Sequence, residues 1–334
     1  MNSSRGPAVL AQGLVKHYEG RDGSVEAVRG VDLEIRAGEI FGFLGPNGAG
    51  KSTTVRMLTT LLTITDGRAE VVGIDVAGNP DDARKRIGVA LQEAGLDPRQ
   101  TGRELLILHG RLFGLGPDEA RDRAQQLLEL VELEDAADRP IKGYSGGMQR
   151  RLDLAAALVH EPQVLFLDEP TTGLDPASRL TIWEELRRIN AQGTTVFLTT
   201  QYLEEADQLC DRLAIIDGGR LVSEGTPARL KAEMGHDVVR LELDGADAGA
   251  TEAATAGLPG LERVVAEPDA LALYLEDGAG SIAEIVRRLD RAEIRVGAIA
   301  VSRPSLDDVF LRATGRRLEG AGEEPEGAEE EEAA

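Results

Sequence analysis

The chain has 334 residues, enough for two domains of ordinary size, and 42% of them are apolar, so it can build folded cores. Its formal charge is −22, and the eight glutamates that follow Arg317 leave −14 on the rest of the chain. Such acidity argues against nucleic-acid partners and against direct binding to anionic lipid, because both need clustered Lys and Arg. No stretch approaches the ~20 apolar residues of a membrane helix, so any membrane-spanning part must belong to another chain. The acidic residues 318–334 form a low-complexity tail that we expect to be disordered.

The first part of the chain alternates short apolar runs with helical patterns, which favours a layered α/β core built on a parallel sheet. The helical pattern is clear in Ser178–Asn190, whose Trp183 we expect in the core. The strand candidates are short runs bounded by turn signals, namely "EIFGFLG", "QVLFLDEP" and Val196–Leu198. We expect this domain to span residues 1–232.

A different pattern begins near residue 235 and predicts a second, smaller domain over residues 236–317. Strand-like alternation in "VVRLELD", "LERVVAE", "LALYLED" and "VGAIAVSR" is joined by an Ala-rich helix at 248–257 and by the helical "SIAEIVRRLDRAEI". The resulting order β-α-β-β-α-β predicts a ferredoxin-like α+β domain. "PSLDDVFLRATG" then predicts a closing helix in which Ser305 is the N-cap and Asp308 lies three residues on.

The stretch "GPNGAGKST" matches the phosphate-binding pattern G-x-x-x-x-G-K-[ST] and lies between a strand candidate and a helix candidate, as this motif requires. This phosphate loop consists of Gly45, Pro46, Asn47, Gly48, Ala49, Gly50, Lys51, Ser52 and Thr53. Its glycines allow backbone N–H groups to turn toward phosphate oxygens at the start of a helix. Lys51 supplies a charge for the β- and γ-phosphates, and the Ser52 hydroxyl is suited to Mg²⁺.

Two carboxylates end the strand candidate "VLFLDEP". Ligands bind at the carboxyl ends of parallel strands, so Asp168 and Glu169 are expected at the nucleotide. Asp168 is suited to the shell of Mg²⁺, and Glu169 is suited to polarising the attacking water. Paired with the phosphate loop, this pattern predicts nucleoside triphosphate hydrolysis.

A second anion site is predicted at Ser145, Gly146 and Gly147, which form a small-residue turn opening a long helix. This turn carries no lysine of its own. Such a turn could complete the phosphate loop of another copy of the chain.

These segments together resemble the ordered motif series of ATP-binding cassette (ABC) ATPases. The matching segments are Gly45–Thr53, Gln92 in "IGVALQEAG", Tyr144–Met148, Val164–Pro170 and Thr171–Pro176. Two further segments, "FLTTQYLEEADQLCDRLAIIDGGRLVSEGTP" and "PSLDDVFLRATG", resemble the daunorubicin-resistance type of exporter ATPase. The resemblance implies a P-loop NTPase cassette, with a RecA-like core and a helical subdomain, followed by a small α+β C-terminal domain.

The resemblance also implies roles for individual residues. Tyr18 matches the aromatic residue that stacks on adenine, and Gln92 matches the glutamine that contacts Mg²⁺ and the water. The turn Ser145–Gly147 would bind the γ-phosphate held by the opposite subunit, and Asp175 would lie at the dimer interface.

The sequence departs from the family pattern at Gln201, which replaces the histidine that follows the strand after Glu169. Gln201 is either the solvated end of a strand or a ligand of the γ-phosphate. A glutamine amide can hold the phosphate and orient water, but unlike histidine it does not titrate near neutral pH. Tyr144 and Met148 also replace residues common in the family, and we expect them to adjust packing.

The resemblance implies the ATPase subunit of an exporter, held peripherally at the cytoplasmic side of the cell membrane by a separate transmembrane permease. Two copies would sandwich ATP and Mg²⁺, and the cargo would be a drug, an antibiotic or a lipid-like amphiphile. The alternatives are a soluble non-transport ABC ATPase, a regulatory nucleotide-binding module that does not hydrolyse ATP, and an importer. The acidity and the single cassette oppose the first, Glu169 opposes the second, and Gln201 with "SLDDVF" favours export.

Overall fold

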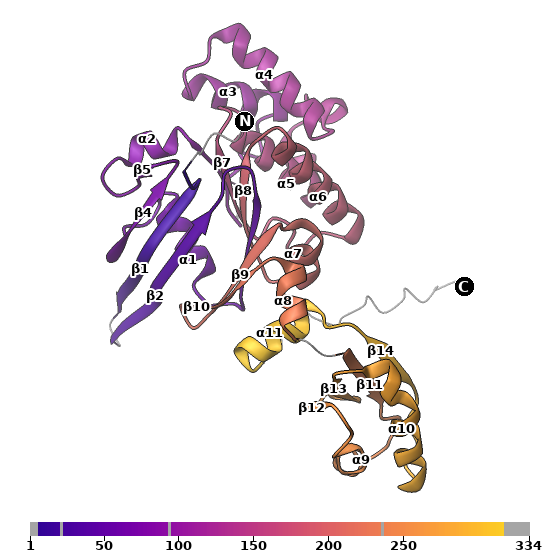
Figure 1. Cartoon of the computed structure of the whole chain (residues 1–334). Coiled ribbons are helices and arrows are strands. Elements are labelled where there is room, and N and C mark those ends of the chain that lie inside the picture. The colour runs from indigo at the N-terminus through magenta and orange to yellow at the C-terminus, as the bar shows by residue number, and fades with distance from the viewer. Residues whose placement is uncertain (1–5, 21–22, 93–94, 235–236, 317–334) are drawn as a thin grey trace, which may run out of the picture. The chain divides into compact units, whose positions relative to one another are not determined.

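The computed structural model describes residues 6–20, 23–92, 95–234 and 237–316 (Figure 1). The chain divides into two compact units, one ending at Pro227 and the other beginning at Ala228. Each unit has its own hydrophobic core, so each is described by itself.

The first unit is built on a six-stranded sheet, counted within the described residues, with the order β10-β9-β3-β8-β7-β6. All neighbouring strands are parallel except β10, which runs antiparallel to β9. The strands are β3 (Ile40–Leu44), β6 (Ile87–Ala90), β7 (Val164–Asp168), β8 (Thr195–Thr200), β9 (Arg212–Asp217) and β10 (Arg220–Gly225). Because parallel neighbours end at the same edge, the residues that follow β3, β6, β7 and β8 are brought together.

The central strands are apolar throughout because both faces of the sheet are covered. Every residue of β3, β7 and β8 is buried. Four of the chain's six phenylalanines pack in this region, with ring centroids 5.5–6.0 Å apart, and they are Phe41, Phe43, Phe166 and Phe197. The predicted strand Val196–Leu198 is too short at its carboxyl end, since β8 runs on through Thr199 and Thr200. Thr199 pairs with both β3 and β7, and Thr200 pairs with Leu44 of β3.

A second sheet and several helices complete the first unit. The second sheet has the order β2-β1-β4-β5 and consists of β1 (Val9–Gly20), β2 (Gly23–Ile35), β4 (Asp66–Val71) and β5 (Ile74–Asp75). The core helices are α1 (Lys51–Leu58), α2 (Pro80–Arg84), α6 (Pro176–Ala191) and α7 (Leu203–Leu209). Three more helices gather at one end of the unit (Figure 1), and they are α3 (Gly102–Leu112), α4 (Pro117–Leu130) and α5 (Gly146–Ala157). The short helices η1 (Glu134–Ala136) and η2 (Ile141–Gly143) lead from α4 into α5. Trp183 is 4% exposed on α6, which confirms its predicted place in the core.

The second unit shows the predicted β-α-β-β-α-β order. Its sheet order is β12-β13-β11-β14, and all pairs are antiparallel. The elements are β11 (Asp237–Glu242), α9 (Ala248–Thr255), β12 (Leu261–Ala266), β13 (Ala270–Leu275), α10 (Gly278–Arg291), β14 (Ile299–Ser302) and α11 (Leu306–Thr314). Ser305 caps α11, and the Tyr274 hydroxyl donates a 2.6 Å hydrogen bond to Asp308.

The division between the units falls within α8 (Pro227–Met234), five residues before the expected boundary at 232. Arg312 of α11 explains this difference, because it donates to the carbonyl oxygen of Glu233 and contacts the sulfur of Met234.

The expected acidic tail, residues 318–334, lies outside the described residues. Within the described part of the chain, no helix is both long enough and apolar enough to cross a bilayer.

Candidate active site

The phosphate loop joins β3 to α1, as its sequence predicts. Gly48 and Gly50 have φ values of 78° and 107°, in the left-handed region that glycine adopts without strain. A side chain at Gly45 would collide with the carbonyl oxygen of Ile216. The loop therefore delivers unpaired helix N–H groups and the start of α1 to the edge of the sheet where the parallel strands end.

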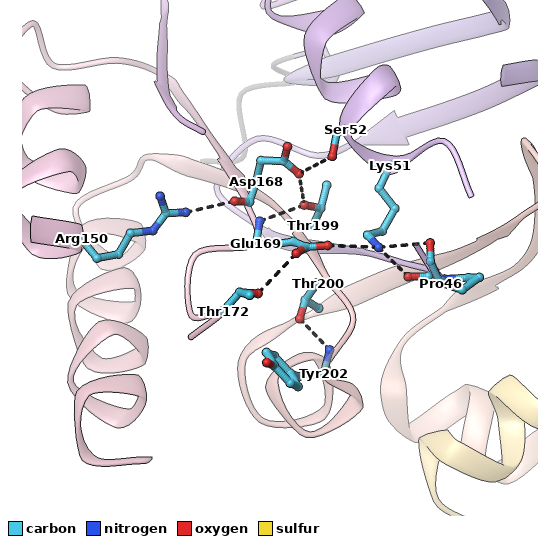
Figure 2. Close-up of polar contacts among 11 residues, drawn as sticks. Pro46, Lys51, Ser52, Arg150, Asp168, Glu169, Thr172, Thr199, Thr200 and Tyr202 are labelled. Atoms are coloured by element: carbon cyan, nitrogen blue, oxygen red, sulfur yellow. Dashed lines mark hydrogen bonds and ion pairs between the residues drawn. The ribbon is translucent and has the colours of Figure 1, made fainter. Parts of the chain in front are cut away.

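Lys51 lies at the centre of this edge and is 4% exposed. Its Nζ donates to the carbonyl oxygens of Gly45 at 2.6 Å and Pro46 at 3.3 Å, and lies 3.2 Å from Oε1 of Glu169 (Figure 2). The ammonium group is thus held at the loop by two backbone acceptors and by one carboxylate.

Asp168 and Ser52 form a pair of oxygen ligands beside the lysine. The Ser52 hydroxyl donates to Oδ1 of Asp168 at 3.1 Å, and the hydroxyl of Thr199 donates to the same oxygen at 2.6 Å (Figure 2). Hydroxyl and carboxylate oxygens are the ligands that Mg²⁺ prefers, and this cation takes further ligands from phosphates and water. The residues present therefore fit the predicted magnesium ion.

Glu169 has a left-handed backbone with a φ of 51°, which is uncommon for a residue with a side chain. Such a conformation costs roughly 1–3 kcal/mol and persists where surrounding contacts impose it. Here the backbone N–H of Glu169 donates to both the carbonyl and hydroxyl oxygens of Thr199, at 3.1 and 3.0 Å. The Thr172 hydroxyl donates to its carboxylate at 3.3 Å. The turn after β7 thereby aims the Glu169 carboxylate at the phosphate loop.

Sequence reasoning did not single out Thr199, although it contacts both carboxylate residues. Its position follows from the register of β7 and β8, which places Thr199 directly opposite Asp168. The available signal was the pair of threonines that follows the apolar run "VFL".

Gln92 and Gln201 lie near the same edge but are not joined to the other site residues. Gln92 follows β6, and Gln201 follows β8, so both come after strands that end beside Asp168. Gln92 is exposed and Gln201 is half-buried. Among the described residues, neither side chain makes a hydrogen bond, so both amides are available to a ligand.

The turn Ser145–Gly147 caps α5, and the Ser145 hydroxyl accepts a 3.3 Å bond from the N–H of Met148. Within the described residues, no hydrogen bond or ion pair joins this turn to the phosphate loop of the same chain. Asp175 caps α6 by accepting bonds from Ser178, and Ser178 lies close to Gly147. The predicted anion turn and the predicted interface residue Asp175 are therefore neighbours, and the turn is not bonded to the phosphate loop that carries Lys51.

Two tyrosines have different surroundings. Tyr18 on β1 is 39% exposed, and Nζ of Lys16 lies 5.6 Å from its ring centroid, so part of the ring is free for stacking. Tyr144 is buried, and its hydroxyl donates to the carbonyl oxygen of Ala136 at 2.7 Å. Burial raises the pKa of Tyr144, and this contact anchors the start of α5 on η1.

Comparison with known families identifies the class of protein to which the chain belongs. Residues 28–172 match the family model described as ABC transporter, and residues 225–314 match the model described as ATP-binding protein DrrA1-3-like, C-terminal domain. The chain therefore belongs to the ATP-binding proteins of ABC transporters, a class of ATPases that binds ATP.

Within this class, the chain belongs to the daunorubicin-resistance type. It is 47% identical to the daunorubicin/doxorubicin resistance ATP-binding protein DrrA of Streptomyces peucetius, with 100% of both chains covered. It is 43% identical to Nod factor export ATP-binding protein I of Ralstonia nicotianae, covering 93% of this chain and 95% of the relative. It is thus an ATPase subunit of a drug-resistance and export transporter family.

Solved structures show the same cassette. A dimeric post-hydrolysis form of the ATP-binding cassette MJ0796, bound to ADP and Pi, has a TM-score of 0.61 and 28% identity, covering 65% of this chain and 98% of that chain. The cbiO1 protein of Clostridium perfringens has a TM-score of 0.62 and 28% identity, covering 68% and 92%.

Proposed function

We propose that this chain hydrolyses ATP as a pair of identical copies docked on a separate permease at the cytoplasmic face of the cell membrane, and thereby drives export. The observation that carries the proposal is the cluster of Lys51, Ser52, Asp168 and Glu169 at one edge of the sheet. A cation, a hydroxyl and two carboxylates are the groups that phosphoanhydride hydrolysis by water requires.

The ion pair between Lys51 and Glu169 links nucleotide binding to catalysis. The two charges neutralise each other across 3.2 Å in a buried setting. A bound triphosphate offers Lys51 more negative charge than one carboxylate does, so the lysine turns to the β- and γ-phosphates. Glu169 is then free to accept a proton from the attacking water.

Ser52 and Asp168 would hold Mg²⁺, which when bound neutralises charge that develops on the phosphates. Thr199 keeps Oδ1 of Asp168 oriented toward Ser52. Among the described residues, no group of three His, Cys, Asp or Glu side chains could hold a metal ion. The two oxygens would therefore share the ion with the nucleotide.

The remaining predicted residues complete the nucleotide site. Gln92 and Gln201 lie at strand ends on the same edge, where their amides would orient the water and hold the γ-phosphate. Tyr18 would stack on adenine with its exposed face. The turn Ser145–Gly147 would reach the γ-phosphate of the opposite copy, and Asp175 beside it would lie at the interface between copies.

The exported cargo is proposed to be a drug, an antibiotic or a lipid-like amphiphile. Support comes from the relatives, which are named for daunorubicin or doxorubicin resistance and for Nod factor export. The cargo would contact the permease and not this chain.

Phosphate release from Mg·ATP tests the proposal directly. The Glu169→Gln variant should bind a fluorescent ATP analogue normally and lose about 10²- to 10⁴-fold in turnover, the contribution of a positioned general base. Glu161→Gln is a matched control, because Glu161 also has a left-handed backbone but is exposed and, within the described residues, forms an ion pair only with Arg123. A parent chain that binds ATP but releases phosphate no faster than Glu169→Gln would instead be a regulatory nucleotide-binding module.

A further inference from the structure

Arg150 lies on α5 five residues after Ser145, and its side chain is 11% exposed. Its guanidinium group donates to three carbonyl oxygens outside its own helix. The acceptors are Asp168 at 3.1 Å, Pro170 at 2.9 Å and Leu91 at 2.5 Å. Figure 2 shows the side chain reaching from α5 to the backbone of Asp168.

These three carbonyl groups flank the predicted catalytic and metal-binding residues. The first belongs to Asp168 itself, the second follows Glu169, and the third precedes Gln92. A guanidinium group is planar and its donors have fixed directions, so one side chain sets the spacing between two backbone segments, the end of β7 and the end of β6. An ion pair with Asp153, at 3.3 Å, fixes the same guanidinium on its own helix.

The helix connects this contact to the anion turn. One α-helix runs from Gly146 to Ala157, and five residues correspond to a rise of roughly 7.5 Å. A short helix moves as a rigid element, so a displacement of the turn at Ser145 displaces Arg150 as well. The three carbonyl groups would follow, because each is bonded to the arginine.

We propose that Arg150 is a positioning residue that couples the two nucleotide sites of the working pair. A nucleotide held by the opposite copy is sensed by the turn at Ser145, and Arg150 then aligns Asp168, Glu169 and Gln92 of its own copy. The inference rests on the proposed function, in which two copies share each nucleotide. It assigns the coupling to one side chain.

Arg151 provides a matched control for a purely structural role. It is the next residue of the same helix, and its guanidinium group also donates to backbone carbonyl oxygens, those of Val131 at 2.9 Å and Glu132 at 3.3 Å. Neither acceptor flanks a site residue. Loss of Arg151 therefore removes a comparable bridge without touching the strand ends.

The experiment compares Arg150→Met, Arg150→Lys and Arg151→Met with the parent chain, using phosphate release over a range of Mg·ATP concentrations. Arg150→Met should keep its affinity for a fluorescent ATP analogue but lose ~10²-fold in kcat, the effect expected when reacting groups move by about 1 Å. Its Hill coefficient should fall to unity, because the sites become independent. Arg150→Lys should recover part of the kcat and part of the cooperativity, and Arg151→Met should resemble the parent in both.

Several results would overturn the inference. One is an Arg150→Met variant with the kcat and cooperativity of Arg151→Met. Another is an Arg150→Met variant whose loss of nucleotide affinity is as large as its loss of kcat, which would mark Arg150 as structural. A parent chain whose turnover is not cooperative would also overturn the inference. A parent that hydrolyses no ATP would overturn the proposed function first and this inference with it.

Discussion

Glu185 lies on α6 with its carboxyl group buried, and the whole residue is 1% exposed. Neither of its oxygens has a hydrogen-bond partner among the described residues. Burial raises the pKa of Glu185 from 4.5 to about 8, while Arg151 and Arg188 oppose the shift and Glu132 adds to it. The folded chain therefore binds this proton more tightly than the unfolded chain does.

The sign of the resulting pH dependence follows from linkage. Stability contributed by the bound proton is complete below pH 4.5 and is lost as the pH rises toward 8. One pKa unit corresponds to about 1.4 kcal/mol, so the free energy of unfolding should fall by roughly 3 kcal/mol between pH 5.5 and 7.5 through this group. Glu185→Met removes the titrating group at similar volume. The free energy of unfolding of this variant, relative to that of the parent, should therefore increase by the same amount between pH 5.5 and 7.5.

Urea unfolding at pH 5.5, 6.5 and 7.5 measures the effect. Trp183 is the single tryptophan and lies two residues away in the same helix, so its fluorescence reports unfolding of the first unit. Glu184→Met is the control, because the Glu184 side chain is 65% exposed. A stability difference between Glu185→Met and the parent that stays constant over this pH range would refute the reasoning.

Further variants at three residues test the site. Lys51→Ala should weaken binding of a fluorescent ATP analogue by about 10- to 100-fold, since a charge-assisted hydrogen bond contributes roughly 1.5–3 kcal/mol; unchanged affinity would remove Lys51 from the site. Thr199→Val keeps the shape but removes the hydroxyl that joins Asp168 to the backbone of Glu169, so kcat should fall about 10-fold at constant nucleotide affinity, a loss of ~1.4 kcal/mol. Gln201→Ala should lower turnover more than affinity, whereas Gln201→His should stay active and gain a pH dependence near ~6.5. Steady-state ATPase rates from pH 5.5 to 8.5 decide the last case, and an alanine variant that matches the parent throughout would make Gln201 only the end of a strand.

Local chemistry was enough to predict the phosphate loop and the carboxylates. Gly48 and Gly50 are needed where the backbone is left-handed, and the sequence displays that need directly. Asp168 ends an apolar strand, and parallel strands carry ligands at their carboxyl ends. The pairing of β7 with β8 then places the segment after β8 beside Asp168.

Contacts that depend on tertiary structure were not predictable. Thr199 and Thr200 are polar and were expected outside the strand, yet both are buried because β8 lies between β3 and β7. Arg150 on a helix is indistinguishable in sequence from its neighbour Arg151, and only the fold shows that it reaches three carbonyl groups beside the site. Glu185 likewise gives no sign in the sequence that its carboxyl group is buried.

The central claim is that two copies share each nucleotide, and light scattering after size-exclusion chromatography tests it most directly. Without nucleotide, Glu169→Gln should elute as a monomer. With Mg·ATP it should elute at twice the monomer mass, because this variant does not hydrolyse the nucleotide that holds the two copies together. Adding Gly146→Asp should abolish the dimer: a side chain at Gly146 has open space within the chain, but its carboxylate would oppose the γ-phosphate of the opposite copy. A Glu169→Gln chain that binds Mg·ATP and stays monomeric, or a dimer that Gly146→Asp leaves intact, would contradict the account.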